Sequence, residues 1–456
     1  MEVVMKKFDV VVVGAGPGGC MAAKILAENG FSVALLERKT DMTQITRTCA
    51  TMVAIENERY FNERMYLNEK NNKIVFPETG FSVSYDGPFC PFYNWNMYSP
   101  DGKHTVQLGD YKAREAQGKR LSVTYSKQHL LDGILKDAVD NGCRVFPSTN
   151  VIDVVSYPGG VKVYTREGTI FEGAFVVAAD GVNSRIAHVT GMNKKRLFYG
   201  TMTGLGLYLN NFKITYPDAF NWIAFYHHDN RLPMAFVATP TPYPDAEFWL
   251  WGSFISSPPE GGADIMGEVK HLFKHSAYAQ WFDDTEIVRH NCHVLNMWSP
   301  LPTPYLDNII FVGDSAWTVE AECTGSMMGG LKAAHAITTA FRDNKINREG
   351  VKSYITWWEN TFPKGENYRD IITLFGIFEL MDEDDVNYLF SLLDEKPLDV
   401  TLNPYRANQI INQVIMEKVA QIQKENPQFL AKLQASAAIP LEKILEPSVR
   451  RAFPNV

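Results

Sequence analysis

The feature that most constrains this chain is a glycine-rich turn near the N-terminus, set between a short apolar run and a helical stretch. Residues 8–13 read Phe-Asp-Val-Val-Val-Val, a β-branched run typical of a buried parallel strand. The turn at residues 14–19 matches GxGxxG, and residues 20–28 continue as an expected helix that ends at Asn29-Gly30. A second strand is expected over residues 32–36. This order of elements is typical of a dinucleotide-binding unit.

Each glycine of the turn has a physical reason to be glycine. Gly14 permits the tight turn, Gly16 lets the backbone approach a pyrophosphate, and Gly19 lets the helix pack closely on the strand. The helix N-terminus adds backbone donors and the positive end of the helix dipole. Glu37 ends the second strand about 20 residues beyond the turn, where a carboxylate accepts from a ribose hydroxyl. The expected cofactor contacts of this unit are Gly14, Ala15, Gly16, Pro17, Gly18, Gly19, Glu37 and Arg38.

Length and composition narrow the class of protein. The 456 residues are 45% hydrophobic and 21% charged, which excludes disordered, collagen-like and disulfide-scaffold chains and allows two to four domains. The net charge is -8 with no basic stripe, so we expect no nucleic acid partner. No apolar run approaches the roughly 20 residues of a transmembrane helix, so no transmembrane segment is expected.

Cysteine and histidine spacing gives no metal signature. The six cysteines are scattered without a CxxC pair, which indicates neither a zinc ribbon nor a disulfide framework. The histidine pairs lack cysteine or acidic partners, so we predict no metal. A reducing cytoplasm is the expected compartment.

Two later segments repeat the pattern of a buried strand followed by a tight turn. Residues 176–179 form the first strand, and Asp180-Gly181 follows it. Residues 308–312 form the second strand, which leads into Gly313-Asp314 and then to Gly325-Ser326-Met327 at the start of a helix. In this order, the three motifs resemble the p-hydroxybenzoate hydroxylase fold of FAD enzymes over about residues 8–340. That superfamily includes aromatic hydroxylases, flavin halogenases and geranylgeranyl reductases.

The resemblance implies an α/β fold in which a Rossmann-type FAD-binding domain is interleaved with an antiparallel-sheet substrate domain. The FAD-binding domain is expected at residues 1–80, 120–190 and 290–340. The substrate domain is expected at residues 81–119 and 191–289, and a C-terminal helical extension at residues 341–456.

The resemblance also assigns roles around an FAD cofactor. The three glycines of GxGxxG would hold the pyrophosphate, Glu37 the adenosine ribose and Asp314 the ribityl chain. The helix that begins near Gly325 would direct its N-terminus at the pyrimidine edge of the flavin, where its dipole stabilises negative charge. The further cofactor contacts implied are Arg47, Thr48, Lys127, Val151, Asp180, Gly181, Gly313, Asp314, Gly325, Ser326 and Met327. Lys127 stands where the superfamily usually has arginine.

Three observations favour a reductase branch over the other branches. Residues 45–50 resemble the geranylgeranyl reductase pattern, in which an arginine and then a cysteine follow the second strand, and this makes Cys49 the candidate catalytic residue. The alternative is a small buried thiol. The hydroxylase pattern DGxxSxxR ends at Ala187 instead of arginine, and only Trp249 and Trp251 remain of the halogenase pattern WxWxIP. In the reductases a proline usually follows the Gly-Asp motif within a few residues, whereas residues 317–324 of this chain contain two carboxylates and Cys323 and no proline. A redox-active pair of Cys49 and Cys323 is a further alternative.

The substrate side is expected within residues 201–254, which alternate like strands and are rich in aromatic side chains. An apolar or aromatic substrate follows from this composition. The candidate pocket residues are Phe225, Phe236, Trp249 and Trp251, and His227 or His228 would donate a proton if it faced the flavin. The amphipathic stretch at residues 405–433 is interpreted as a cap on the substrate channel or a homodimer face.

These observations predict an FAD-dependent oxidoreductase similar to geranylgeranyl reductases. We expect hydride transfer between flavin N5 and an apolar substrate, with NAD(P)H, ferredoxin or a partner reductase as electron donor. The leading alternative is a flavin-dependent monooxygenase that acts through a C4a-hydroperoxide. A flavin halogenase and a non-enzymatic, chaperone-like relative are the remaining alternatives.

Overall fold

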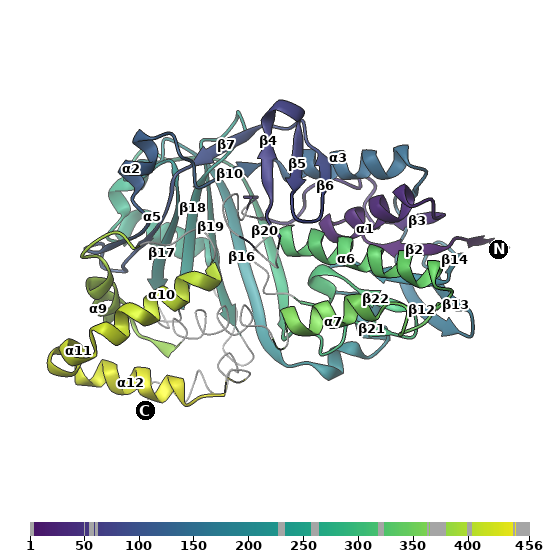
Figure 1. Ribbon diagram of the computed structural model, residues 1–456. Helices are drawn as coiled ribbons and strands as arrows, with labels where there is room; N and C mark the ends of the chain where they lie inside the picture. Colours follow the sequence, from purple (N-terminus) through teal and green to yellow (C-terminus); the bar gives the residue numbers. More distant parts are fainter. Residues whose placement is uncertain are drawn as a thin grey trace.

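The computed structural model describes residues 4–49, 51–53, 59, 63–226, 233–256, 264–317, 323–362, 364, 380–398, 404–440 and 443. Among these residues the chain forms five sheets, and two of them, with six and seven strands, dominate the architecture. Figure 1 shows the smaller of the two with its helices beside the N-terminus, and the larger one beside the C-terminal helices.

The six-stranded sheet carries the N-terminal motif. At its centre β2 (Val10–Val13) lies between β3 (Val33–Leu36) and β15 (Phe175–Ala178), and all three strands are parallel. Every residue of these strands is buried and apolar, as expected for parallel strands that are covered on both faces. On one side the sheet ends at β11 (Arg144–Phe146), which pairs with β3. On the other side β22 (Ile309–Phe311) pairs with β15, and antiparallel β21 (Tyr305–Leu306) forms the edge.

Helices cover one face of this sheet. Here α1 (Pro17–Glu28) packs against both α3 (Lys127–Asp140) and α6 (Cys323–Arg342), and α7 (Lys352–Thr361) packs on α6 (Figure 1). The contact between α1 and α6 is unusually close. A Cβ atom added to Gly330 would lie 2.2 Å from the carbonyl oxygen of Gly18, so the two backbones touch directly.

Smaller sheets and helices complete this half of the molecule. A four-stranded sheet packs against β2 and β15, and a three-stranded sheet packs against α3. In order, the first contains β1 (Val4–Lys7), β14 (Thr169–Gly173), β13 (Gly160–Thr165) and β12 (Val151–Tyr157). The second contains β4 (Tyr66–Asn68), β5 (Lys73–Phe76) and β6 (Phe81–Ser84). A two-stranded sheet pairs β7 (Phe89–Phe92) with β10 (Ser122–Tyr125), and the short helix α4 (Arg185–Val189) packs against β12. The short helix α2 (Tyr111–Ala116) lies instead beside the larger sheet, where the ring of Tyr111 is 5.0 Å from that of Tyr216 (Figure 1).

The seven-stranded sheet is antiparallel except where β17 pairs with β8. Its order is β20 (Glu286–Trp298), β16 (Phe198–Asn210), β19 (Phe248–Ser256), β18 (Pro233–Pro240), β17 (Ala219–Tyr226), β8 (Asn94–Tyr98) and β9 (Thr105–Leu108). Because side chains alternate along a strand, the sheet has two faces. The outer face carries Leu205, Phe225, Phe236 and Leu250, and it packs in one core with α5 (Ile265–His275).

We call the opposite side the inner face, and it carries Trp95, Trp222, Trp249, Trp251 and His293. The C-terminal helices pack in one core with its residues on β8 and β17. The ring of Trp222 lies 6.3 Å from the ring of Phe390 in the first of these helices. The helices are α9 (Glu383–Leu393), α10 (Pro404–Glu417), α11 (Val419–Glu425) and α12 (Pro427–Ala437). They therefore cover part of the face that bears Trp249, which is the placement that a cap requires.

Two further points concern the expected organisation. The third segment of the FAD-binding domain was expected from residue 290, whereas β20 keeps residues up to Trp298 in the seven-stranded sheet. No helix in the described part of the chain is both long enough and apolar enough to span a bilayer.

Candidate functional site

The glycine-rich turn joins β2 to α1, and its three glycines differ in what surrounds them. Gly14 has a φ of +100°, and a Cβ there would lie 2.2 Å from the carbonyl oxygen of Ala179. A Cβ on Gly19 would lie 1.9 Å from the carbonyl oxygen of Gly14. By contrast, a Cβ on Gly16 would meet no atom within 4 Å. Packing therefore requires the first and third glycines, whereas the second borders open space at the N-terminus of α1.

Glu37 stands at the end of β3 beside this turn. Its Oε2 accepts a hydrogen bond of 2.9 Å from the backbone N–H of Ala15, and its Oε1 accepts one of 2.9 Å from the backbone N–H of Lys39. The side chain is buried, whereas the neighbouring Arg38 is exposed. The carboxylate is thus fixed against the glycine-rich turn from the side of the second strand.

The Asp180-Gly181 motif has a structural role in this fold. The Asp180 carboxylate accepts hydrogen bonds from the Ser184 hydroxyl at 2.6 Å and from the Ile186 N–H at 3.0 Å, and so it ties the loop to the first turn of α4. Burial raises the pKa of this carboxyl. Gly181 follows with a φ of +83°, and Val151 is a buried residue at the start of β12.

Asp314 and Arg47 meet although they are far apart in the chain. Arg47 lies in the loop after β3, and its Nη2 is 2.7 Å from Oδ2 of Asp314, which follows β22. The negative charge of Asp314 raises the pKa of Arg47. Gly313 has a φ of +63°, and a Cβ there would lie 2.4 Å from Oγ of Ser326 in the first turns of α6. Met327, the next residue, is buried. The loop after β3, the end of β22 and the start of α6 therefore converge.

Cys49 and Cys323 come together at the same place. The thiol of Cys323, the first residue of α6, donates a hydrogen bond to the sulfur of Cys49. This bond lowers the pKa of Cys49 well below its ordinary value against the effect of burial, and the positive charges of Lys127 and Arg47 act in the same direction. Burial alone would lower the pKa of Lys127. The negative charge on the two sulfurs has the larger effect, and the pKa of this amine is raised. Two thiols and two cations thus form one electrostatic group.

Thr48 connects this group to the inner face of the large sheet. Its Oγ1 accepts a hydrogen bond of 3.0 Å from Nε1 of Trp249. The ring of Trp251 lies parallel to that of Trp249 with centroids 6.4 Å apart. Both tryptophans therefore stand on the side of the sheet that faces Cys49.

The prediction for Phe225 and Phe236 needs a correction, because both belong to the outer face. Phe236 pairs with Ile223 and Gly252 across the sheet, and the ring of Phe225 packs on it at 5.3 Å, in the same core as Leu272 of α5. The alternation of strand residues excludes them from the face that carries the tryptophans. His227 and His228 lie outside the described residues.

Two residues of the inner face were missed by the sequence reasoning. His293 on β20 is buried, and the ring stacks on Trp251 with centroids 6.1 Å apart. Asn291 lies two residues earlier on the same face. A signal was available, since Asn291 and His293 lie two residues apart and so share a face if the segment is a strand, but a histidine is more often structural than functional. No group of three histidine, cysteine or acidic side chains in the described segments could hold a metal ion.

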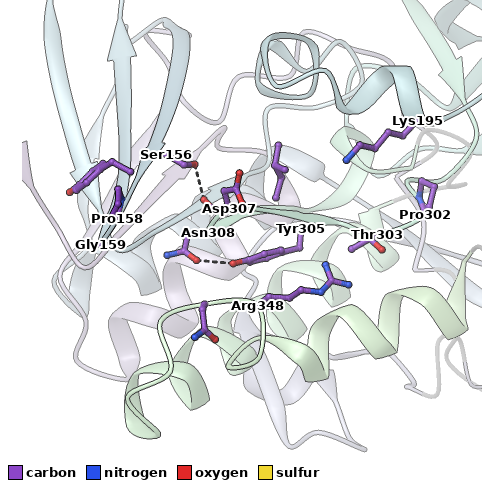
Figure 2. Close-up of a pocket in the computed structure, with 13 residues that line it drawn as sticks. Ser156, Pro158, Gly159, Lys195, Pro302, Thr303, Tyr305, Asp307, Asn308 and Arg348 are labelled. Carbon is purple, nitrogen blue, oxygen red and sulfur yellow. Dashed lines mark hydrogen bonds between the residues drawn. The ribbon is translucent and has the colours of Figure 1, made fainter.

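The hollow drawn in Figure 2 lies away from this site. It measures about 840 Å³ and is lined by the turn before β22, by the loop after β12 and by exposed Lys195 and Arg348. Tyr305 donates a hydrogen bond of 2.7 Å to Asn308 in its wall. Because Asn308 precedes β22 and Gly313 follows it, the hollow and the Gly313-Asp314 turn lie at opposite ends of this strand.

The residues present fit an FAD molecule. The turn offers backbone N–H groups, a helix N-terminus and open space beside Gly16, which is what a pyrophosphate requires. Glu37 supplies the acceptor for a ribose, and the start of α6 supplies a second helix N-terminus near Asp314 and Arg47.

Comparison with known proteins agrees with this geometry. The family described as FAD binding domain matches residues 7–251. The digeranylgeranylglycerophospholipid reductase of Methanothrix thermoacetophila is 24% identical over 393 residues, which cover 84% of this chain and 90% of the relative. A geranylgeranyl bacteriochlorophyll reductase-like structure from Thermoplasma acidophilum has a TM-score of 0.70 at 16% identity, covering 93% of this chain and 100% of that chain. The halogenase PltM in complex with phloroglucinol and FAD has a TM-score of 0.61 at 12% identity, covering 98% and 90% of the two chains.

The structural likenesses show the fold, which is the expected p-hydroxybenzoate hydroxylase-type arrangement. The family match confirms the expected FAD cofactor. The family match itself spans more than half of the sequence. This chain therefore belongs to the FAD-binding domain family and is an FAD-dependent oxidoreductase.

Proposed function

We propose that this oxidoreductase reduces carbon–carbon double bonds of an apolar, isoprenoid-type substrate. The single observation that carries the proposal is the group formed by Cys49, Cys323, Lys127 and Arg47 beside the tryptophans of the inner face. This group combines a thiol pair, in which the pKa of Cys49 is lowered and that of Cys323 is raised, with a wall suited to an apolar chain. The names of the relatives, which refer to reduction of geranylgeranyl groups, support the same class of substrate.

The cofactor would be held along the converging loops. The turn at Gly14–Gly19 and the N-terminus of α1 would bind the pyrophosphate, and Glu37 would bind the adenosine ribose. Asp314, oriented by Arg47, would meet the ribityl chain, and the start of α6 would face the pyrimidine edge. When bound there, FAD supplies hydride-transfer chemistry.

The residues of the chain would orient the substrate and move a proton. Reduction of a double bond needs a hydride on one carbon and a proton on the other. The proton shared by the sulfurs of Cys49 and Cys323 would go to the second carbon, and Lys127 and Arg47 would stabilise the negative charge left on the sulfurs. The tryptophans and the C-terminal helices would exclude water from the inner face. We propose NAD(P)H, ferredoxin or a partner reductase as the source of electrons.

Anaerobic stopped-flow absorbance tests this proposal with geranylgeraniol as the probe. Reduced enzyme should be reoxidised by the probe without oxygen, and mass spectrometry should detect a product that is two hydrogens heavier. Hydroxylated geranylgeraniol formed in proportion to consumed O₂, with no anaerobic reoxidation, would replace the proposal with the monooxygenase alternative.

A cysteine variant tests the role of the thiol pair. Cys49→Ala should slow reoxidation by the probe by about 10²-fold or more, the usual contribution of a positioned acid, while its FAD content stays normal. The matched control is Cys292→Ala, which removes an exposed thiol from β20. Unchanged reoxidation in Cys49→Ala would exclude this cysteine as the acid.

A further inference from the structure

Three buried polar atoms without hydrogen-bond partners cluster on the inner face of the large sheet. They are Nδ1 and Nε2 of His293 and Oδ1 of Asn291. His293 is only 8% exposed, and the two residues occupy alternate positions of β20 opposite Gly204 and Gly206 of β16. Buried polar groups in native proteins almost always have a partner, so three that lack one at a single place indicate a bound group.

The two glycines let the side chains of this cluster lie directly against β16. A Cβ on Gly204 would lie 2.2 Å from Cε1 and 2.4 Å from Nε2 of His293, so the imidazole rests directly on the glycine backbone. A Cβ on Gly206 would lie 2.7 Å from Oδ1 of Asn291 and 2.2 Å from Oγ1 of Thr48. The stack on Trp251 fixes the ring from the side. The polar atoms therefore lie next to Thr48, the neighbour of Cys49.

The chemistry of the cluster selects a neutral group. Burial and the positive charge of Arg47 lower the pKa of His293 to about 4, so its imidazole is neutral at pH 7 and carries one donor and one acceptor nitrogen. The same charge of Arg47 disfavours a cation. The acceptor Oδ1 of Asn291 repels a carboxylate or a phosphate. A hydroxyl group is neutral and pairs two of the three atoms, because it can donate to Asn291 and accept from the imidazole N–H.

We propose that His293 and Asn291 form a polar subsite that binds a neutral hydroxyl group of an otherwise apolar substrate. The subsite would fix the register of an isoprenoid alcohol along the tryptophans and so determine which double bond reaches the reacting centre. The inference relies on the proposed function only for the isoprenoid character of the chain, and it concerns binding rather than reaction.

Binding to the oxidised enzyme tests the subsite without turnover. The probes are geraniol and 2,6-dimethyl-2,6-octadiene, its counterpart without the hydroxyl, and each is titrated by the change in flavin absorbance. The wild type should bind geraniol about tenfold more tightly, because the hydrocarbon leaves the buried polar atoms unpaired. In His293→Phe and in Asn291→Leu, the ratio of the two affinities should fall to about one. His290→Phe, at an exposed position of the same strand, should leave the ratio unchanged.

Thermal melting separates this role from a structural one. Replacing an unpartnered buried histidine by a phenylalanine of similar shape should leave the melting temperature unchanged or raise it. Equal wild-type affinities for the two probes, or no measurable binding of geraniol, would refute the subsite. So would a His293→Phe protein that melts lower while its affinity ratio is preserved. If geraniol binds preferentially but no probe reoxidises the reduced enzyme, the subsite stands and the proposed function fails.

Discussion

Replacing Gly16 with valine should abolish cofactor binding while leaving the fold intact. The backbone of Gly16 has φ −77° and ψ 179°, a conformation that any residue adopts, and no atom lies within 4 Å of an added Cβ. The free energy of unfolding of the cofactor-free protein should therefore change by less than about 0.5 kcal/mol, as for substitutions that disturb no packing. The isopropyl group would stand where a pyrophosphate approaches the turn.

The size of the effect follows from linkage between binding and folding. FAD at 100 times its Kd stabilises the wild type by about 2.7 kcal/mol, and a variant that cannot bind FAD loses all of this. Denaturant unfolding with and without FAD measures the difference, and absorbance after gel filtration measures the bound flavin.

Gly19→Ala provides the contrasting variant. Its added methyl group would lie 1.9 Å from the carbonyl oxygen of Gly14, so the cofactor-free protein itself should lose about 1–3 kcal/mol through overpacking. The reasoning is wrong if Gly16→Val retains FAD with wild-type affinity. It is equally wrong if the cofactor-free Gly16→Val protein is destabilised as much as Gly19→Ala.

Three further predictions concern the surroundings of the site. Cys323→Ala removes the hydrogen bond that lowers the pKa of Cys49, so the thiolate should form at higher pH, and an unshifted thiolate absorbance titration would contradict this. Tyr354→Phe removes the hydroxyl that donates a 2.6 Å hydrogen bond to the carbonyl oxygen of Phe311, at the end of β22. Denaturant unfolding should show that the free energy of unfolding falls by about 1–3 kcal/mol, while the FAD content stays normal. Lys432→Met removes the cation 2.5 Å from the buried Asp385 carboxylate and should destabilise the protein by about 1–2 kcal/mol. The same change at Lys424 in α11 should leave the free energy of unfolding unchanged.

The N-terminal unit was predictable because its determinants are local. The helix expected over residues 20–28 extends over Pro17–Glu28, and the strand expected over residues 32–36 extends over Val33–Leu36. Turn sterics, a helix N-terminus and a run of β-branched residues act within a few positions of the chain. The sequence therefore contains nearly all the information that this unit needs.

The substrate side was less predictable because it depends on contacts between distant segments. Alternation shows that Phe225 and Trp249 each occupy one face of a strand, but only the packing of α5 decides which face becomes the outer core. Asp180 could not be recognised as a helix-capping residue without the turn that brings Ser184 and Ile186 to it. The sequence likewise does not reveal that His293 lacks hydrogen-bond partners. Its ring lies against Gly204 of the neighbouring strand, and glycine has no side chain that could pair with it.

The contact of Gly18 with Gly330 has a consequence for how the protein tolerates change. The first turn of α1 and the middle of α6 are in contact through two backbones that touch, with no side chain between them to be repacked. The spacing between these two helices is therefore set by main-chain geometry and not by the size of any residue. Substitutions elsewhere in the core can alter stability without altering this distance. The helices that carry the cofactor side of the site would thus keep their separation while residues of the substrate face change.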